Sequence, residues 1–181
     1  MVFYINSQKE NSSKEIAYIL KKCILHHPGR WSELIFLCIG TDRVTGDCLG
    51  PYIGQQLSHL NMKGIYVYGT LEQPVHALNL PKISRYIKSA HPDGLIIAID
   101  ASLGQKKHLG YVTIGSGALY PGAGVQKELP PVGDIHITGI VNIGGVLEQL
   151  TLQTTRLSTV ISMADAITQG ILCYTNALTC L

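Results

Sequence analysis

The sequence predicts a three-layer α/β fold, in which helices cover both faces of a central, twisted and mostly parallel sheet. Two short runs, residues 34–39 and 95–99, are apolar without alternation, which is typical of strands buried on both faces. Segments with helical periodicity separate the predicted strands, and this alternation indicates right-handed crossovers in a parallel core. A chain of 181 residues has the size of one domain, spanning 1–181.

Periodicity and turn residues give the expected elements in chain order. Ser12, with Glu15 three residues later, resembles a helix cap, and Pro51 fits the first turn of a later helix. The segment 109–114 follows the third strand almost directly, so we expect it to pair antiparallel at a sheet edge. The predicted elements are a helix from Ser12 to a stop at 26–29, a strand at 34–39, a helix from Pro51 to Leu60, a strand at 65–68, a helix at 80–90, a strand at 95–100, a strand at 109–114 and a helix at 157–178.

Charge and composition narrow the class of partner. Charged residues make up 14% of the chain and the net charge is +2. The basic residues are scattered, without a stripe that interleaves aromatics, so nucleic-acid binding has no support. Polar residues interrupt the apolar helix at 157–178 about once per turn, and we expect no membrane span. A face of the first or the last helix could pair subunits, which leaves the oligomeric state open.

The cysteines bear on the compartment. There are five of them, an odd number, and no two form a C-x-x-C motif. Without a disulfide framework or zinc-finger spacing, a reduced compartment is indicated. Residues 1–8 lack the basic and apolar regions of a signal peptide. We therefore expect a cytoplasmic protein.

Two aspartates follow buried strands at the same end of the predicted sheet. Asp47 closes the loop after the strand 34–39, and Asp100 ends the strand 95–100. Ligands of open α/β sheets bind outside the carboxyl ends of strands, so both acids are expected to line one crevice. Such a pair can share a proton and activate water, or hold a divalent metal that supplies the activated water. An aspartate at a strand end can also simply cap the next helix.

His136 is the candidate for a third member of this site. It lies in the segment 133–139, which returns toward the sheet after a glycine-rich loop. Together with Asp47 and Asp100 it would give an oxygen-plus-imidazole ligand set for a transition metal. The competing interpretation is structural, because a lone histidine beside isoleucines more often has no catalytic role.

Other residues could serve the same crevice. Glu72, four residues after the second strand, would sit on its rim, and Asp42 and Arg43 lie inside the first loop, where they could contact substrate. The glycine-rich loop 115–133 is either functional or a mobile surface loop. Cys48 could act as a nucleophile with His136 as base, although no local protease signature surrounds it.

The residues around the two aspartates resemble a known group of proteins. The loop 44–51, Val-Thr-x-Asp-x-Leu-Gly-Pro, and the segment 97–101, Ile-Ala-Ile-Asp-Ala, resemble the two aspartate segments of the spore germination protease. The overall spacing, with the late segments 138–142 and 152–157, is similar to that of the YyaC sporulation proteins, a short relative. This second resemblance spans most of the chain.

The resemblance implies a fold similar to that of the hydrogenase maturation proteases, and it implies that Asp47 and Asp100 are catalytic acids. In the hydrogenase maturation proteases, two acids and a histidine bind the nickel of the substrate. Those roles would fall here on Asp47, Asp100 and His136. Asp42 stands where those proteases usually show Asn, which argues against nickel recognition. The chain also lacks the extra length of the germination protease. The resemblance therefore does not carry over that enzyme's substrate, the small acid-soluble spore proteins.

We therefore predict a sporulation-associated peptidase that uses Asp47 and Asp100 to hydrolyse a protein or peptide substrate, with or without a divalent metal such as nickel or zinc. The alternative is a non-catalytic sporulation factor that uses the same crevice to bind a partner, a peptide or a metal. Carboxyl groups close together across an open crevice would favour the enzyme. An Asp47 buried and locked into loop amides would favour the alternative.

Overall fold

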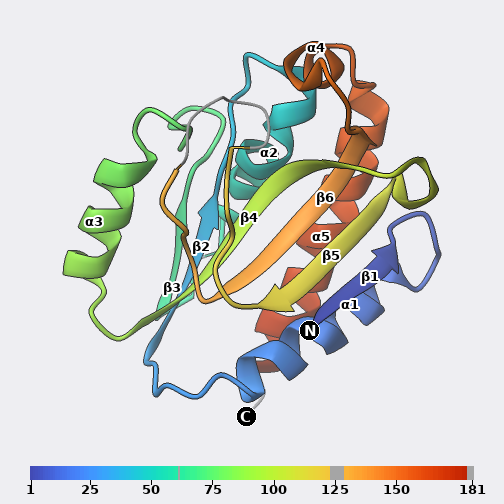
Figure 1. Cartoon of the computed structure of the whole chain (residues 1–181). Coiled ribbons are helices and arrows are strands. Elements are labelled where there is room, and N and C mark those ends of the chain that lie inside the picture. The colour runs from blue at the N-terminus through green and yellow to red at the C-terminus, as the bar shows by residue number, and fades with distance from the viewer. Residues whose placement is uncertain (61, 123–128, 179–181) are drawn as a thin grey trace.

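The computed structural model describes residues 1–60, 62–122 and 129–178, and these residues form a sheet of six strands (Figure 1). The order across the sheet is β1-β5-β6-β4-β2-β3. The pairs β2–β3, β2–β4 and β4–β6 are parallel, and β5 is antiparallel to both β6 and β1. The strands are β1 (Val2–Asn6), β2 (Glu33–Cys38), β3 (Ile65–Tyr68), β4 (Gly94–Gly104), β5 (Tyr111–Ser116) and β6 (Ile135–Ile143).

Helices cover both faces of the sheet, as the sequence predicted (Figure 1). On one face lie α1 (Ser12–Leu25), α2 (Leu49–Leu57) and α5 (Leu157–Leu178), which share a core cluster with the strands. On the other face, α3 (Leu80–Ala90) and the segments around Leu119 and Val132 enclose a smaller cluster. The crossover from β2 to β3 passes through α2 and the one from β3 to β4 through α3, so the three-layer α/β fold is confirmed.

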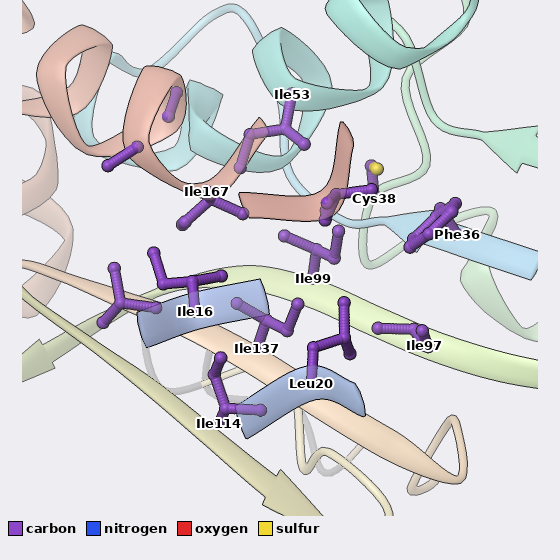
Figure 2. Close-up of a cluster of buried hydrophobic side chains, with 14 of the residues drawn as sticks. Ile16, Leu20, Phe36, Cys38, Ile53, Ile97, Ile99, Ile114, Ile137 and Ile167 are labelled. Atoms are coloured by element: carbon purple, nitrogen blue, oxygen red, sulfur yellow. The ribbon is translucent and has the colours of Figure 1, made fainter. Parts of the chain in front are cut away.

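The larger core explains why the strands contain continuous apolar runs. Figure 2 shows Ile99 of β4 and Ile137 of β6 in one cluster with two helix residues, Ile16 of α1 and Ile167 of α5. Ile96 and Ala98 of β4 instead join the cluster under α3. Because β4 buries both of its faces, alternating polarity is absent from its first half.

Several predicted boundaries were wrong. The strand β4 continues beyond Asp100 to Gly104, because it still pairs with β6 after its pairing with β2 has ended. The predicted strand at 109–114 is β5, which is antiparallel but not at the edge, since the unpredicted β1 lies outside it. Ser12 does not cap α1: it is the first helical residue, and its hydroxyl donates to the carbonyl of Ser7.

The helix α5 is long and apolar. By length and composition alone, its 22 residues, Leu157–Leu178, are apolar enough to cross a membrane. In the fold, however, half of its most apolar stretch is buried, and its buried residues belong to the core cluster shared with α1 and α2. Its apolar character is thus accounted for by packing within the domain.

Candidate functional site

A cleft of about 530 Å³ opens at the carboxyl ends of β2 and β4. It lies where the chain leaves β2 through α2 on one face and returns to β4 through α3 on the other. This change of direction is the position at which open α/β sheets bind ligands. The cleft contains the predicted pair and further polar side chains, namely Asp42, Arg43, Asp47, Glu72, His76, Asp100 and Ser102.

Asp47 is placed by a tight turn directly after β2. Gly40 has a φ of 138°, and a Cβ there would lie 2.0 Å from the backbone oxygen of Asp47. Only glycine fits such an approach. The N–H of Thr41 donates to that same oxygen at 3.1 Å. The loop therefore folds back on itself, and Asp47 lies in the 3-10 turn η1 (Thr45–Cys48) that leads into α2.

The short helix α4 (Glu148–Gln153), which the sequence did not reveal, packs on the Asp47 loop at the top of Figure 1. A Cβ on Gly46 would lie 2.8 Å from the Leu152 side chain and 2.9 Å from Oγ1 of Thr155. The side-chain amide of Asn142 donates to the Thr151 carbonyl at 3.2 Å and to Oγ1 of Thr155 at 3.1 Å. These contacts fix one wall of the cleft against the end of β6.

Asp100 enters the cleft from the middle of β4. The strand β2 ends beside Ile99, so Asp100 is the first residue of β4 that β2 no longer covers. Its side chain is buried, with 8% exposed, and Oδ1 accepts the N–H of Ala101 at 2.8 Å. A register shift between Ser102 and Leu103 follows directly. Such bulges re-aim side chains next to functional sites, and both of these residues line the cleft.

Both carboxyl groups have raised pKa values. Burial raises the pKa of Asp47 to about 6, and a hydrogen bond from the Thr41 backbone offsets part of this rise. The pKa of Asp100 is raised well above its ordinary value, first by burial and then by the negative charge of Asp47. The two groups thus interact across the cleft, and the charge of one disfavours the charge of the other.

His136 does not join the pair. In the register of β4 and β6, Thr138 lies beside Asp100, whereas His136 lies beside Ala98, two residues nearer the amino end. The ring Nδ1 lies 3.0 Å from the carbonyl oxygen of Gly117. The structure therefore does not place His136 beside Asp100.

The structure also gives a test of whether a metal fits. Across residues 1–60, 62–122 and 129–178, no three His, Cys, Asp or Glu side chains are grouped so as to hold a metal ion. A nickel or zinc site built on Asp47 and Asp100 would lack a third protein ligand within that part of the chain. The described donor set does not fit the expected metal.

The candidate substrate-binding residues line the same cleft. Asp42, Arg43 and Glu72 all line the cleft, and all three side chains are exposed. The loop 115–133 contributes too, since Pro121 and Leu129 line the same cleft. Its residues 123–128 lie outside the described part of the chain.

Ser102 and His76 are among the polar residues of the cleft that the sequence did not indicate. Ser102 follows Asp100 by two positions, and its hydroxyl donates to Thr138 Oγ1 at 3.3 Å. His76 lies in the segment after β3, next to Val75, which forms a parallel bridge with Ile39. Ser102 could have been found from the alternation of β4. The segment of His76 meets the sheet through a single bridge, and no hydrophobic periodicity in the sequence indicates it.

Cys48 lacks the properties of a nucleophile. Its side chain is buried, and Sγ donates to the carbonyl of Thr45 at 3.0 Å. Burial raises the pKa of the thiol, and the negative charges of Asp47 and Asp42 raise it further. Since the thiolate is the reactive form, this thiol is held unreactive.

Fold and site together define a three-layer α/β protein with an aspartate pair in a cleft at the carboxyl edge of its parallel strands. The family described as "Protein of unknown function (DUF1256)" matches residues 4–170. The "Uncharacterized protein YyaC" of Bacillus subtilis (strain 168) is 44% identical over 168 residues, which cover 93% of this chain and 81% of the relative. The chain belongs to the DUF1256 family and is a YyaC-type protein.

Proposed function

We propose that this protein is a peptidase in which Asp47 and Asp100 hydrolyse an amide bond of a protein or peptide. The observation that carries the proposal is the pair itself: two interacting carboxyl groups in one cleft, both with raised pKa values. Such a pair can hold one proton between its members, so that one group serves as base and the other as acid. The resemblance of both aspartate segments to those of the spore germination protease supports the same roles.

The proposed reaction uses one carboxylate and one carboxylic acid. At neutral pH, Asp47 with its pKa of about 6 is mostly ionised and accepts a proton from water as the oxygen attacks the amide carbon. Asp100, whose pKa is raised well above its ordinary value, carries the proton and donates it to the departing nitrogen. The products are a carboxylic acid and an amine. The proton on Asp47 then passes to Asp100, which restores the pair.

The walls of the cleft support a peptide as the substrate. Apolar side chains flank the acids on several sides, and Leu78 on the rim is 78% exposed. Exposed apolar residues beside a polar centre suit a substrate with apolar side chains around the bond that is cut. The apolar lining residues include Leu71, Leu78, Leu103, Leu129 and Leu152.

The proposed setting is the cytoplasm of a spore-forming bacterium, with a role linked to sporulation. The resemblance to the YyaC sporulation proteins, together with a YyaC relative in Bacillus subtilis, supports the link to sporulation. The three buried cysteines among the described residues are free thiols, which supports a reduced compartment.

An internally quenched peptide library gives the test. Wild-type protein is expected to cleave a subset of the library, and Asp47→Asn and Asp100→Asn are each expected to lower kcat/KM by about 100- to 10,000-fold. Asp93→Asn is the matched control, because Asp93 is exposed just before β4, at the opposite end of the sheet. Unchanged cleavage in both site variants would contradict the proposal.

The rival proposal is a non-catalytic sporulation factor that binds a partner or peptide in the same cleft. The burial of Asp100, with its Oδ1 bonded to the Ala101 N–H, is the observation that favours it. Peptides that bind without being cleaved, in a manner that depends on Asp47, would select this rival.

A further inference from the structure

We infer that His76 is a third catalytic residue, which donates its Nε2–H to the carbonyl oxygen of the scissile amide. This inference rests on the proposed peptidase function and assigns a role that the acid pair leaves open. During attack by water, negative charge develops on the carbonyl oxygen, and a positioned donor in a partly desolvated site stabilises it.

The segment that carries His76 is fixed to the same turn as Asp47. Val75 forms a parallel bridge with Ile39 at the end of β2, and its carbonyl accepts the N–H of Gly40 at 2.8 Å. The next residue, Thr41, donates to the backbone oxygen of Asp47. One short turn therefore joins the histidine and the proposed base, and both line the cleft.

Local hydrogen bonds also fix the ring. The backbone N–H of His76 donates to Oδ1 of Asn79 at 2.8 Å, and the amide of Asn79 donates to the carbonyl of Pro74 at 3.0 Å. The N–H of Leu78 donates to Nδ1 of the His76 ring at 3.3 Å. Since Nδ1 accepts, the proton of the neutral ring is on Nε2.

The Nε2–H is the unused donor of this ring. Within the described chain it has no hydrogen-bond partner, although the side chain is half-buried. A donor held this way, on a ring that lines the cleft, is available to a ligand. His91 shows the contrast, since its Nδ1 lies 2.8 Å from Glu33 Oε2 and its Nε2 2.7 Å from the Tyr68 hydroxyl.

With His76 assigned, each of the three residues has a separate role in the proposed hydrolysis. Asp47 accepts the proton of water, His76 Nε2–H stabilises the oxyanion without giving up its proton, and the proton of Asp100 remains for the leaving nitrogen. His76 is not proposed as a metal ligand, because it forms no group of three ligating side chains within the described residues.

Two measurements test the inference. Long-range ¹H–¹⁵N NMR at about neutral pH reports the protonated ring nitrogen of His76, identified by its loss in His76→Gln. We expect the Nε2–H form. A ring protonated on Nδ1, or on both nitrogens, would overturn the inference whether or not the protein cleaves peptides.

The kinetic test uses the peptide library with His76→Ala and His76→Gln. We expect His76→Ala to lower kcat by about 100- to 1,000-fold with little change in KM. His76→Gln should recover part of the loss, because the glutamine amide can place an N–H near the position of Nε2. His59→Gln, at an exposed histidine after α2, is the control.

The outcomes separate the two proposals. Cleavage that requires Asp47 and Asp100 but is unaffected in His76→Ala would overturn the role of His76 alone. A wild-type protein that cleaves no library peptide would overturn the proposed function, and the catalytic role of His76 with it.

Discussion

Asp47 interacts with Asp100 across the cleft, and its negative charge adds to burial in raising the pKa of Asp100. One residue comes from the turn after β2 and the other from the middle of β4. The fold thus brings two like charges into a partly desolvated place, an arrangement that costs stability and is therefore informative about function.

Replacing either acid should stabilise the protein at neutral pH. Because the pKa of Asp47 is about 6 in the fold and 3.8 is its ordinary value, the folded state binds more protons between these pH values. Its stability therefore falls as pH rises through this window. We expect Asp47→Asn to be more stable than wild type at pH 7 by about 1–2 kcal/mol, after allowance for partial solvent screening.

Urea denaturation at several pH values checks this expectation. The stability gain of Asp47→Asn should shrink toward zero below about pH 3, where the carboxyl is protonated in both states. Asp100→Asn should act in the same direction. Asp93→Asn, an exposed acid outside the cleft, should show no comparable gain. A loss of stability in Asp47→Asn at neutral pH would contradict the direction of the pKa shift.

Gly46 should tolerate no side chain. A Cβ there would lie 2.8 Å from both a methyl carbon and the backbone oxygen of Leu152, so Gly46→Ala forces α4 away from the Asp47 loop. We expect a loss of about 1–3 kcal/mol in the free energy of unfolding. Gly145→Ala is the matched control, because a Cβ at Gly145 would meet nothing within 4 Å. Equal stability of the two variants would show that α4 does not pack on the loop as described.

The thiols should differ in reactivity. Cys173 is exposed, whereas Cys48 is buried and its thiol pKa is raised by burial and by nearby acids. Alkylation with iodoacetamide at neutral pH, mapped by mass spectrometry, is expected to modify Cys173 well before Cys48. Rapid modification of Cys48 would instead revive it as a candidate nucleophile.

The parallel part of the fold could be predicted because its signals are local. The helix α3 and the strand β3 have the predicted bounds, 80–90 and 65–68, since turn residues flank each apolar pattern. The strand β1 was missed because it is an edge strand in which Ile5 alone is fully buried. Its pairing with β5 depends on a contact across more than half of the chain.

The sequence indicated those residues of the candidate site that lie near the ends of apolar strand runs. Both aspartates lie in the cleft because Asp47 comes after the carboxyl end of β2 and Asp100 lies in β4 just beyond that end. The position of His136 relative to the pair depends on strand register, and the sequence does not reveal that Thr138 is the residue beside Asp100. His76 was missed because a single bridge, between Ile39 and Val75, brings its segment to the cleft.

The central claim is that Asp47 and Asp100 form one coupled pair, and carboxyl-carbon NMR of ¹³C-labelled aspartates tests it without a substrate. Titration from about pH 3 to about pH 9 should show Asp47 with a pKa of about 6 and Asp100 well above its ordinary value. In Asp47→Asn the pKa of Asp100 should fall, yet stay raised because burial remains its larger cause. If both carboxyls titrate with ordinary pKa values, and Asp47→Asn leaves Asp100 unchanged, the two residues do not form a pair and the account is wrong.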